Sequence, residues 1–265
     1  MTAAKFVNTY VSTSNAYALQ YQIPSLALIA LAAYVSRWGN YTVDFVNVIK
    51  SVFSSVNYNA AKKHVDDGDR FLKILLANDK DSYTVKSYAR MVKLSVGYQV
   101  DILYADKVKS NKNLFINSVL YYSRLLNIDP DWLMIIFDME CNFNHRAVNP
   151  YTNATGLIQF TPATAKAYGT SVDALYNMPN YEQLPYVYKF YKGKTGKIFS
   201  LYDLYKLTIL PISYGKDATW ILKFGNVTAK TFATQNKRYD LNKDYAVTIN
   251  ELETWIYNTY VKNMT

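Results

Sequence analysis

Helix-breaking residues are scarce along this chain. Its 265 residues include only 9 Gly and 7 Pro, the two residue types that interrupt helices most strongly. Half of the residues are hydrophobic and 18% are charged, which supplies enough apolar material for buried cores and is unlike a disordered chain. The length is generous for one compact domain and comfortable for two. We therefore expect a folded, mainly α protein.

The charge of the chain indicates which partners it attracts. The formal net charge of +9 implies attraction to polyanions, among them nucleic acid, an anionic cell wall and a membrane surface. The lysines are scattered, and the sequence has no arginine-rich block and no zinc-finger or RNA-binding signature. Nucleic acid is therefore not expected as a partner. The 26 Tyr residues are interpreted as packing residues.

Cysteine and histidine are too few for the sites that they usually build. The single cysteine, Cys141, excludes an internal disulfide, and two histidines, His64 and His145, do not support a His/Cys metal site. The longest apolar run, 23–35, is too short to span a membrane and is predicted to form a buried helix. The first residues show no signal-peptide pattern, so we expect a soluble chain without an export signal.

The chain is predicted to have three sections. A helical domain is expected over 1–110, a second domain over 111–235, and a short acidic-polar segment with a helix over 236–265. The polar stretch 105–113 is the most plausible boundary. It contains no Gly/Ser-rich linker, so the two larger sections should pack together.

The middle section carries clear helix signals. Asp129 is a suitable N-cap, Pro130 suits the first helical position, and Asp131 complements the helix dipole. Apolar residues then recur at helical spacing up to Cys141. Glu140 lies in the last turn, where the helix dipole disfavours a carboxylate. Helix stability therefore does not explain its position.

The residues after this helix predict turns and a second helix. The pairs Asn149-Pro150 and the run 153–156 have turn chemistry and separate short apolar runs, in the manner of a small β-hairpin. Thr161-Pro162 should cap a further helix that ends at Gly169.

Glu140 is the candidate catalytic residue. Cleavage of a glycosidic bond needs an acid that protonates the departing oxygen, and a carboxyl group can do this where an apolar site raises its pKa. A glutamate at a helix end is usually a solvated surface group, but the residues around this one change the interpretation. The string ECNFNHRAVNPYTNATGLIQFTPATA, 140–165, resembles the signature of soluble lytic transglycosylases and goose-type lysozymes.

This resemblance implies a lysozyme-like fold with a small β-hairpin, in which Glu140 is the catalytic acid and base. Cys141 stands where the family usually has Ser, and a buried, inert thiol is expected there. Gln159 is implied to bond the substrate or to orient Glu140. Tyr214 is the nearest match to the family's A-Y-N motif, although its neighbours depart from it. The implied substrate-binding residues are Phe143, Asn149, Gly156, Leu157, Ile158, Gln159 and Tyr214, of which Gly156 also suits a turn with positive φ, and Leu157 and Ile158 also suit the core.

The count of carboxylates bears on the reaction. A retaining or inverting glycosidase needs a second carboxylate facing the first. Asp138 lies about 200° around the helix from Glu140, and no acidic residue occurs between Cys141 and Asp173. In the family that the chain resembles, the 6-hydroxyl of the substrate attacks and a single Glu serves as acid and base.

The expected activity is thus a peptidoglycan lytic transglycosylase that cleaves the MurNAc-GlcNAc β-1,4 bond and needs no cofactor for catalysis. Two alternatives stay open. One is a hydrolytic muramidase of the same fold, and the other is a catalytically inactive virion protein with a structural or wall-docking role.

The N-terminal section resembles the opening of bacterial and phage glucosaminidase domains. Pro24 opens and Gly39 closes an apolar helical run, and the segments 23–25 and 36–39 align loosely with that family. The position of its catalytic Glu holds Val35. A section that has lost its acid, serving as scaffold or wall-binding module, and an unrelated helical domain are both compatible with this sequence.

The segment 240–251 has the spacing of an EF-hand calcium loop. Tyr245 stands where such loops usually have Gly, which should strain the turn, so the expectation is a weak structural Ca²⁺ site or its relic. The predicted ligands are Asp240, Asn242, Asp244, Ala246 through its carbonyl, Thr248 and Glu251.

These features together suit a bacteriophage wall-degrading protein. It would act as a virion or tail component at entry, or as an endolysin at exit. The expected partners are peptidoglycan glycan strands and other virion or tail proteins. The expected location is the phage virion or the periplasm and cell wall of the host.

Overall fold

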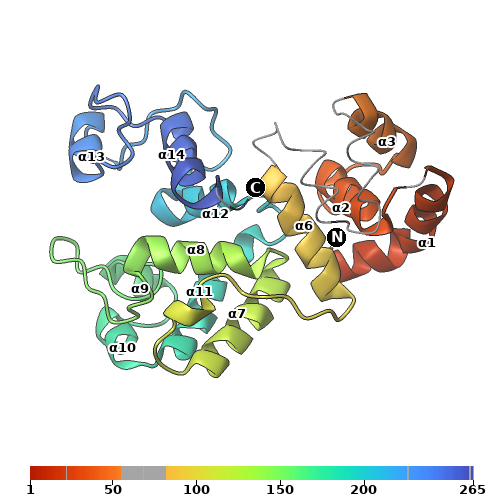
Figure 1. The fold of residues 1–265 in the computed structure, drawn as a ribbon. Helices are drawn as coiled ribbons and strands as arrows, with labels where there is room; N and C mark the ends of the chain where they lie inside the picture. Colours follow the sequence, from red (N-terminus) through yellow and green to blue (C-terminus); the bar gives the residue numbers. More distant parts are fainter. Residues whose placement is uncertain (22, 55–67, 69–81, 226, 263, 265) are drawn as a thin grey trace. The chain divides into compact units, whose positions relative to one another are not determined.

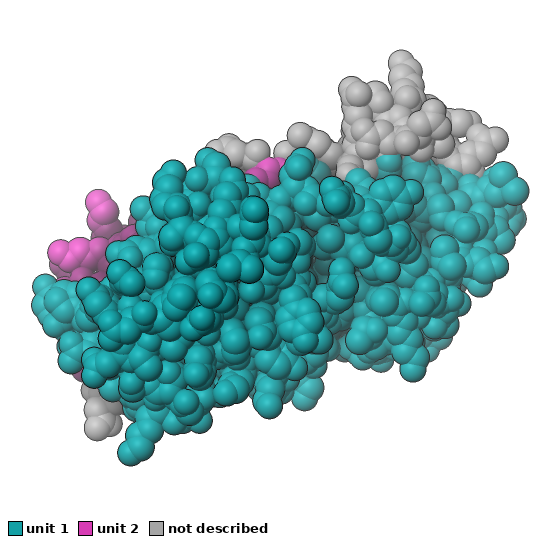
Figure 2. Space-filling view, turned by 90° about the horizontal axis from the view of Figure 1, so that it is seen from below, with its two compact units in different colours: residues 1–199 teal, residues 200–265 magenta. Residues whose placement is uncertain are grey.

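The computed structural model describes residues 1–21, 23–54, 68, 82–225, 227–262 and 264 (Figure 1). His64 lies outside them. The described part is mainly helical, as the sequence predicts. The chain forms two compact units, Met1–Phe199 and Ser200–Thr265 (Figure 2), and each is described by itself. The division near residues 110 and 235 stays a prediction.

The first unit begins with the helices α1 (Ala3–Tyr21), α2 (Ser25–Ser36), α3 (Phe45–Ser54) and α6 (Ser82–Ser95). The helix α2 packs against the other three, and most of its residues are buried, as predicted for the apolar run. It ends at Ser36 because Arg37 and Trp38 both adopt positive φ. None of the helices in the described ranges is long and apolar enough to cross a membrane.

The rest of the first unit contains the helix α8 (Pro130–Cys141), and every residue of this helix except Asp138 and Glu140 is buried. The helix α7 (Lys112–Leu126) packs against α8, against α11 (Leu184–Tyr191) and against the 3₁₀ helix η2 (Asn180–Gln183) (Figure 1). The other elements of this part are η1 (Ala105–Lys107), α9 (Pro162–Ala167), α10 (Val172–Asn177) and η3 (Lys192–Lys194).

The start of α8 has the predicted cap. The side chain of Asp129 accepts a hydrogen bond of 2.9 Å from the backbone N–H of Asp131, and Pro130 occupies the first turn. Both carboxylates also pair with Arg90 of α6, at 3.4 Å and 3.1 Å. The indole N–H of Trp132 donates to the buried hydroxyl of Ser87, also on α6, at 3.0 Å. The helix α6 is therefore ion-paired and hydrogen-bonded to the first turn of α8.

The expected β-hairpin is present only as two consecutive turns. Thr155 forms isolated antiparallel bridges with Val148 on one side and Phe160 on the other, and no strand forms in the described ranges of the chain. The two turns share Thr155, so neither side has room for a regular ladder, and Pro150 offers no N–H to extend one. The second helix signal is confirmed, because Thr161 caps α9.

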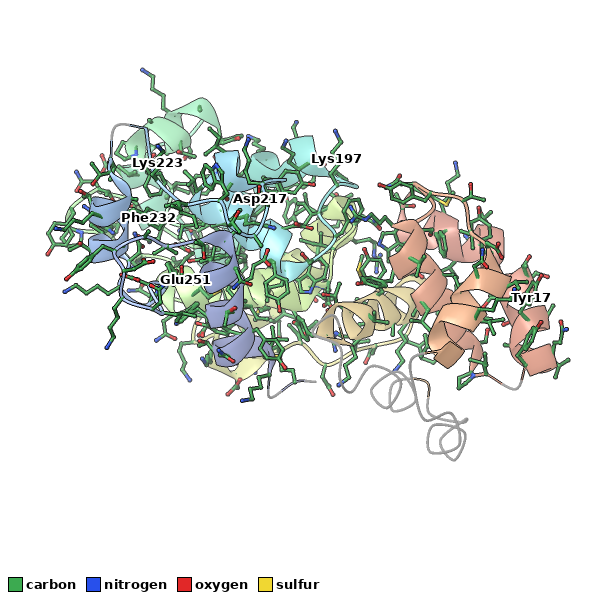
Figure 3. The ribbon with its side chains drawn as sticks, turned by 90° about the horizontal axis from the view of Figure 1, so that it is seen from above. Tyr17, Lys197, Asp217, Lys223, Phe232 and Glu251 are labelled. Carbon is green, nitrogen blue, oxygen red and sulfur yellow. The ribbon has the colours of Figure 1, made fainter. Side chains whose placement is uncertain are left out.

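The second unit contains short helices around a buried pair of tyrosines. The hydroxyls of Tyr205 and Tyr239 are hydrogen-bonded to each other. Phe232 lies on α13 and Glu251 on α14 (Figure 3). A single bridge joins Ile221 to Thr248. The helices are α12 (Leu201–Ile209), η4 (Pro211–Ser213), α13 (Ala229–Gln235), α14 (Ile249–Ile256) and the π-type turn η5 (Tyr257–Val261).

Candidate active site

Glu140 lies in the last turn of α8 and is partly buried. The helix ends directly after it because Asn142 and Phe143 adopt positive φ, 47° and 60°. The backbone N–H of Asn142 satisfies the carbonyl of Asp138. A positive φ is costly for a bulky residue such as Phe. The chain thus turns sharply directly after Glu140, which is partly buried while most other residues of α8 are buried.

Between α7 and η3 the chain contains five acidic residues besides Glu140, and the structure shows where each of them lies. Asp138 forms a 2.8 Å ion pair with Lys107, which holds it on another side of α8. Asp129 and Asp131 lie at the opposite end of the helix, about 15 Å away at 1.5 Å per residue. The remaining acidic residues between α7 and η3 are Asp173 on α10 and Glu182 on η2, and both are exposed.

Cys141 is buried, as expected for an inert thiol. Its Sγ–H lies 3.2 Å from the carbonyl of Phe137 and 3.7 Å from that of Leu157. Burial, and then the neighbouring charge of Glu140, raise the pKa of the thiol to about 12. The thiol is therefore protonated at neutral pH, and it connects α8 with the turn that contains Leu157.

The G-L-I-Q motif is a tight turn, 156–159, closed by paired hydrogen bonds of 2.9 and 3.0 Å between Thr155 and Phe160. Gly156 has a φ of 90°, in the region that favours glycine. The side chains of Leu157 and Ile158 are buried in the core. Their predicted contact with substrate stays a prediction, whereas their structural role is visible.

Gln159 is partly buried and has a φ of 53°. Its amide nitrogen donates to the carbonyls of Ala147 at 3.2 Å and Gly156 at 3.0 Å. Its Oε1 accepts no hydrogen bond from the residues that the structure describes. The amide is thus oriented by the backbone, with the acceptor left for another group.

Phe143 and Asn149 flank the same segment. The ring of Phe143 makes an edge contact with Tyr104, whose centroid is 6.2 Å away. The side-chain oxygen of Asn149 accepts from the backbone N–H groups of Tyr151 and Thr152, so that oxygen shapes the loop. Substrate contact by Phe143 and Asn149 stays a prediction.

Sequence reasoning missed Tyr104 and Lys107, because Lys107 lies in the polar stretch 105–113 that is interpreted as a boundary and Tyr104 directly precedes that stretch. The Lys107 ammonium lies 4.2 Å from the Tyr104 ring centroid and also pairs with Asp138. Burial and the charge of Asp138 raise the pKa of Tyr104. The sequence signal for this contact was a Tyr followed closely by Asp and Lys, at 104–107.

Two predicted positions lie away from this cluster in the sequence. Tyr214 belongs to the second unit, where it follows η4 and is partly buried, and its approach to Glu140 stays a prediction. Val35 is 54% exposed. It lines a hollow of about 340 Å³ together with Asp44, and other lining residues are Ala32, Thr42, Asn47 and Val48.

The EF-hand-like segment forms a compact loop before and into α14. Glu251 lies inside that helix and accepts from the N–H and hydroxyl of Thr248 in a capping box. Tyr245 has a φ of 65°, as the sixth position of such a loop requires. Its N–H donates to Asp240 Oδ2 at 3.2 Å, and Oδ1 is buried with no hydrogen bond in the described chain.

The fit of this loop to a cation is incomplete. Asn242 Oδ1 and Asp244 Oδ1 also accept backbone N–H groups of the loop. In the described part of the chain, no three His, Cys, Asp or Glu side chains are grouped so that they could hold a metal ion. The Ca²⁺ site therefore stays a prediction.

Comparison with known protein families gives a match in the middle of the chain, where residues 119–184 match the model of the transglycosylase SLT domain. The comparisons with curated proteins and with solved structures gave no match. The matched segment includes Glu140, Gly156 and Gln159, and it excludes Tyr214. The segment 119–184 is therefore similar to the transglycosylase SLT domain, as the resemblance of the chain to the lytic transglycosylases predicts.

Proposed function

We propose that this protein is a lytic transglycosylase that cleaves the MurNAc-GlcNAc β-1,4 bond of peptidoglycan with Glu140 as its catalytic residue. One observation carries the proposal. Glu140 is a partly buried carboxylate in the last turn of α8, inside the segment 119–184 that matches the SLT domain, at the position where the resemblance implies the catalytic acid.

This arrangement suits a reaction with one carboxyl group. Protonated Glu140 gives its proton to the glycosidic oxygen as the C1–O bond of MurNAc breaks. The resulting carboxylate then accepts the proton of the MurNAc 6-hydroxyl, whose oxygen bonds to C1. The product is a 1,6-anhydro sugar, no water is consumed, and Glu140 regains its proton. A second carboxylate to activate water or to attack C1 is not required.

The position of Glu140 suits the proposed role. The residue is partly buried at the end of an otherwise largely buried helix, and the C-terminal end of a helix disfavours negative charge. The amide of Gln159, oriented by two carbonyls, is proposed to hydrogen-bond the substrate beside it.

The proposed setting is a bacteriophage protein that degrades the wall of its host, as a virion or tail component or as an endolysin. Its net charge of +9 suits an anionic cell wall. Peptidoglycan glycan strands are the proposed substrate, and other virion or tail proteins are proposed partners.

The experiment is digestion of purified peptidoglycan, followed by mass spectrometry of the soluble products. A transglycosylase releases fragments that end in anhydro-MurNAc and are lighter by one water than hydrolysis products. Fragments with reducing ends would instead identify a hydrolytic muramidase. An intact sacculus after prolonged incubation with folded protein would favour the inactive, wall-docking alternative.

A further inference from the structure

A buried amide connects three segments around the candidate site. Gln183, the last residue of η2, is 0% exposed. Its Oε1 accepts from the backbone N–H of Leu157 at 2.9 Å. Its Nε2 donates to the carbonyls of His145 at 2.8 Å and Leu175 at 2.7 Å. Both N–H groups of the amide are therefore used, and the side chain has no exposed surface with which to touch a substrate.

The position of Gln183 also explains a glycine of the SLT motif. A Cβ atom at Gly156 would lie 2.6 Å from Gln183 Oε1, closer than any non-bonded contact allows. The positive φ of Gly156 disfavours a side chain as well. The glycine of the turn and the buried amide therefore form one packed unit, although 26 residues separate Gln183 from Leu157.

This unit fixes the turn 156–159 against the segment that follows Glu140. Gly156 donates its N–H to the carbonyl of Ala147 at 3.1 Å, and Gln159 bonds the same carbonyl at 3.2 Å. Leu157 is held at both polar groups, its N–H by Gln183 and its carbonyl by the thiol of Cys141. A change at Gln183 is thereby transmitted to both sides of the site.

We propose that Gln183 is a positioning residue that sets the place of the Gln159 turn relative to Glu140. The inference rests on the proposed transglycosylase function and names a residue that acts through others. Because Gln183 is fully buried and acts only through the placement of the Gln159 turn relative to Glu140, its loss should lower kcat more than it changes KM. Misplacement of reacting groups by about 1 Å can cost on the order of 100-fold in rate.

Two substitutions separate positioning from packing. Gln183→Met keeps length and approximate volume but removes all three hydrogen bonds, which leaves the partners at Leu157, His145 and Leu175 unsatisfied. Gln183→Glu keeps the acceptor for Leu157, and its carboxyl group can donate to one carbonyl only when it is protonated. Activity of the Glu variant, relative to wild type, should therefore recover as the pH is lowered.

Asn180→Leu is the matched control. Asn180 is a buried amide on the same 3₁₀ helix, and it donates to the carbonyl of Ser110 at 2.8 Å rather than to the turn. Its loss should destabilise the protein to a similar degree without moving Gln159.

The experiment measures kcat, KM and Tm of the four full-length proteins on soluble peptidoglycan strands. For Gln183→Met we expect kcat to fall about 10- to 100-fold, with KM within about threefold of wild type. Asn180→Leu should keep kcat within about twofold at a comparable loss of Tm. Equal losses of kcat in both variants, or a loss expressed in KM, would overturn the positioning role.

The Glu variant decides the question if Gln183→Met does not fold. Its kcat relative to wild type should rise as the pH falls, and a constant ratio across pH would contradict the inference. A wild-type protein that releases no product would instead refute the proposed function, so the two failures are distinguishable.

Discussion

Cys141 shows how much of the site depends on contacts that a local pattern does not contain. Its place beside Glu140 follows from the sequence, and so does its burial, because a thiol behaves as a small apolar group. Its bond to the carbonyl of Leu157, 16 residues away, could not be predicted from spacing. The same holds for Gln183, whose partners lie in three separate segments. Caps such as Asp129 were predicted because their partners are neighbours in the chain.

We predict that Cys141 is unreactive in the folded protein. Its thiol pKa of about 12 leaves only about one thiolate in ten thousand at pH 8, and the thiolate is the reactive form. A chromogenic disulfide reagent should release no colour from native protein over an hour and one equivalent from protein in denaturant. Stoichiometric release from native protein within minutes would show an accessible thiol and contradict the burial.

At the scale of elements, the helix α8 carries acidic residues at both of its ends. Its C-terminal end carries Glu140, and its N-terminal end carries the buried carboxylates that pair with Arg90 of α6. Burial first, and then the charge of Asp129, raise the pKa of Asp131 to about 7, against the opposing effect of Arg90. Burial also raises the pKa of Asp129, and the neighbouring phenol of Tyr83 has a pKa well above its usual value.

A pH dependence of stability follows from Asp131. The pKa of an unfolded Asp is about 3.9, so between pH 4 and 7 the folded state binds more protons than the unfolded state. The free energy of unfolding contributed by Asp131 therefore decreases as the pH rises through this window. Asp131→Asn keeps an acceptor for the N–H of Leu103 and cannot ionise, so it should remove this decrease.

Denaturant titrations of both proteins at several pH values between about 4.5 and 7.5 provide the measurement. The difference in unfolding free energy between wild type and variant should change steadily across the window. Asp173→Asn, at an exposed position, is the control and should follow the wild type. A constant difference for Asp131→Asn would show that Asp131 does not titrate there.

In the loop 240–251, Asp240 Oδ1 is buried without a hydrogen bond from the described residues. A cation would satisfy this oxygen, whereas both carboxylate oxygens of Glu251 already accept hydrogen bonds from backbone N–H groups. We therefore predict weak binding, with Tm higher by a few degrees in saturating Ca²⁺ than in chelator.

The variant Asp240→Asn should abolish this difference, and Asp217→Asn, in the same unit but outside the loop, should keep it. Identical melts of the wild type in both buffers would mean that the loop is held by its own hydrogen bonds.

At the scale of the whole molecule, the sequence predicted the mainly helical class, the buried α2 and the capped α8. It overestimated the β-hairpin, because hydrophobic alternation does not reveal that two turns share Thr155. The boundary at 105–113 stays a prediction, and Lys107 within this stretch pairs with Asp138 of α8. The catalytic candidate itself was predictable, since Glu140, Gly156 and Gln159 lie in one short continuous segment.

In the N-terminal section, Val35 is exposed where the glucosaminidase resemblance would require an acid. We therefore expect this section to contribute no cleavage. All wall-degrading activity of the full-length chain should then depend on the SLT domain, and on Glu140 within it.

The most direct test of this account is peptidoglycan release by the full-length Glu140→Gln protein beside wild type. The amide keeps the shape of the side chain and removes its transferable proton, and loss of a general acid typically costs about 10²–10⁴-fold in rate. Circular dichroism and Tm should match wild type, while product release falls to near background. Undiminished release by the folded variant would contradict the assignment of Glu140, and it would place the chemistry elsewhere in the chain.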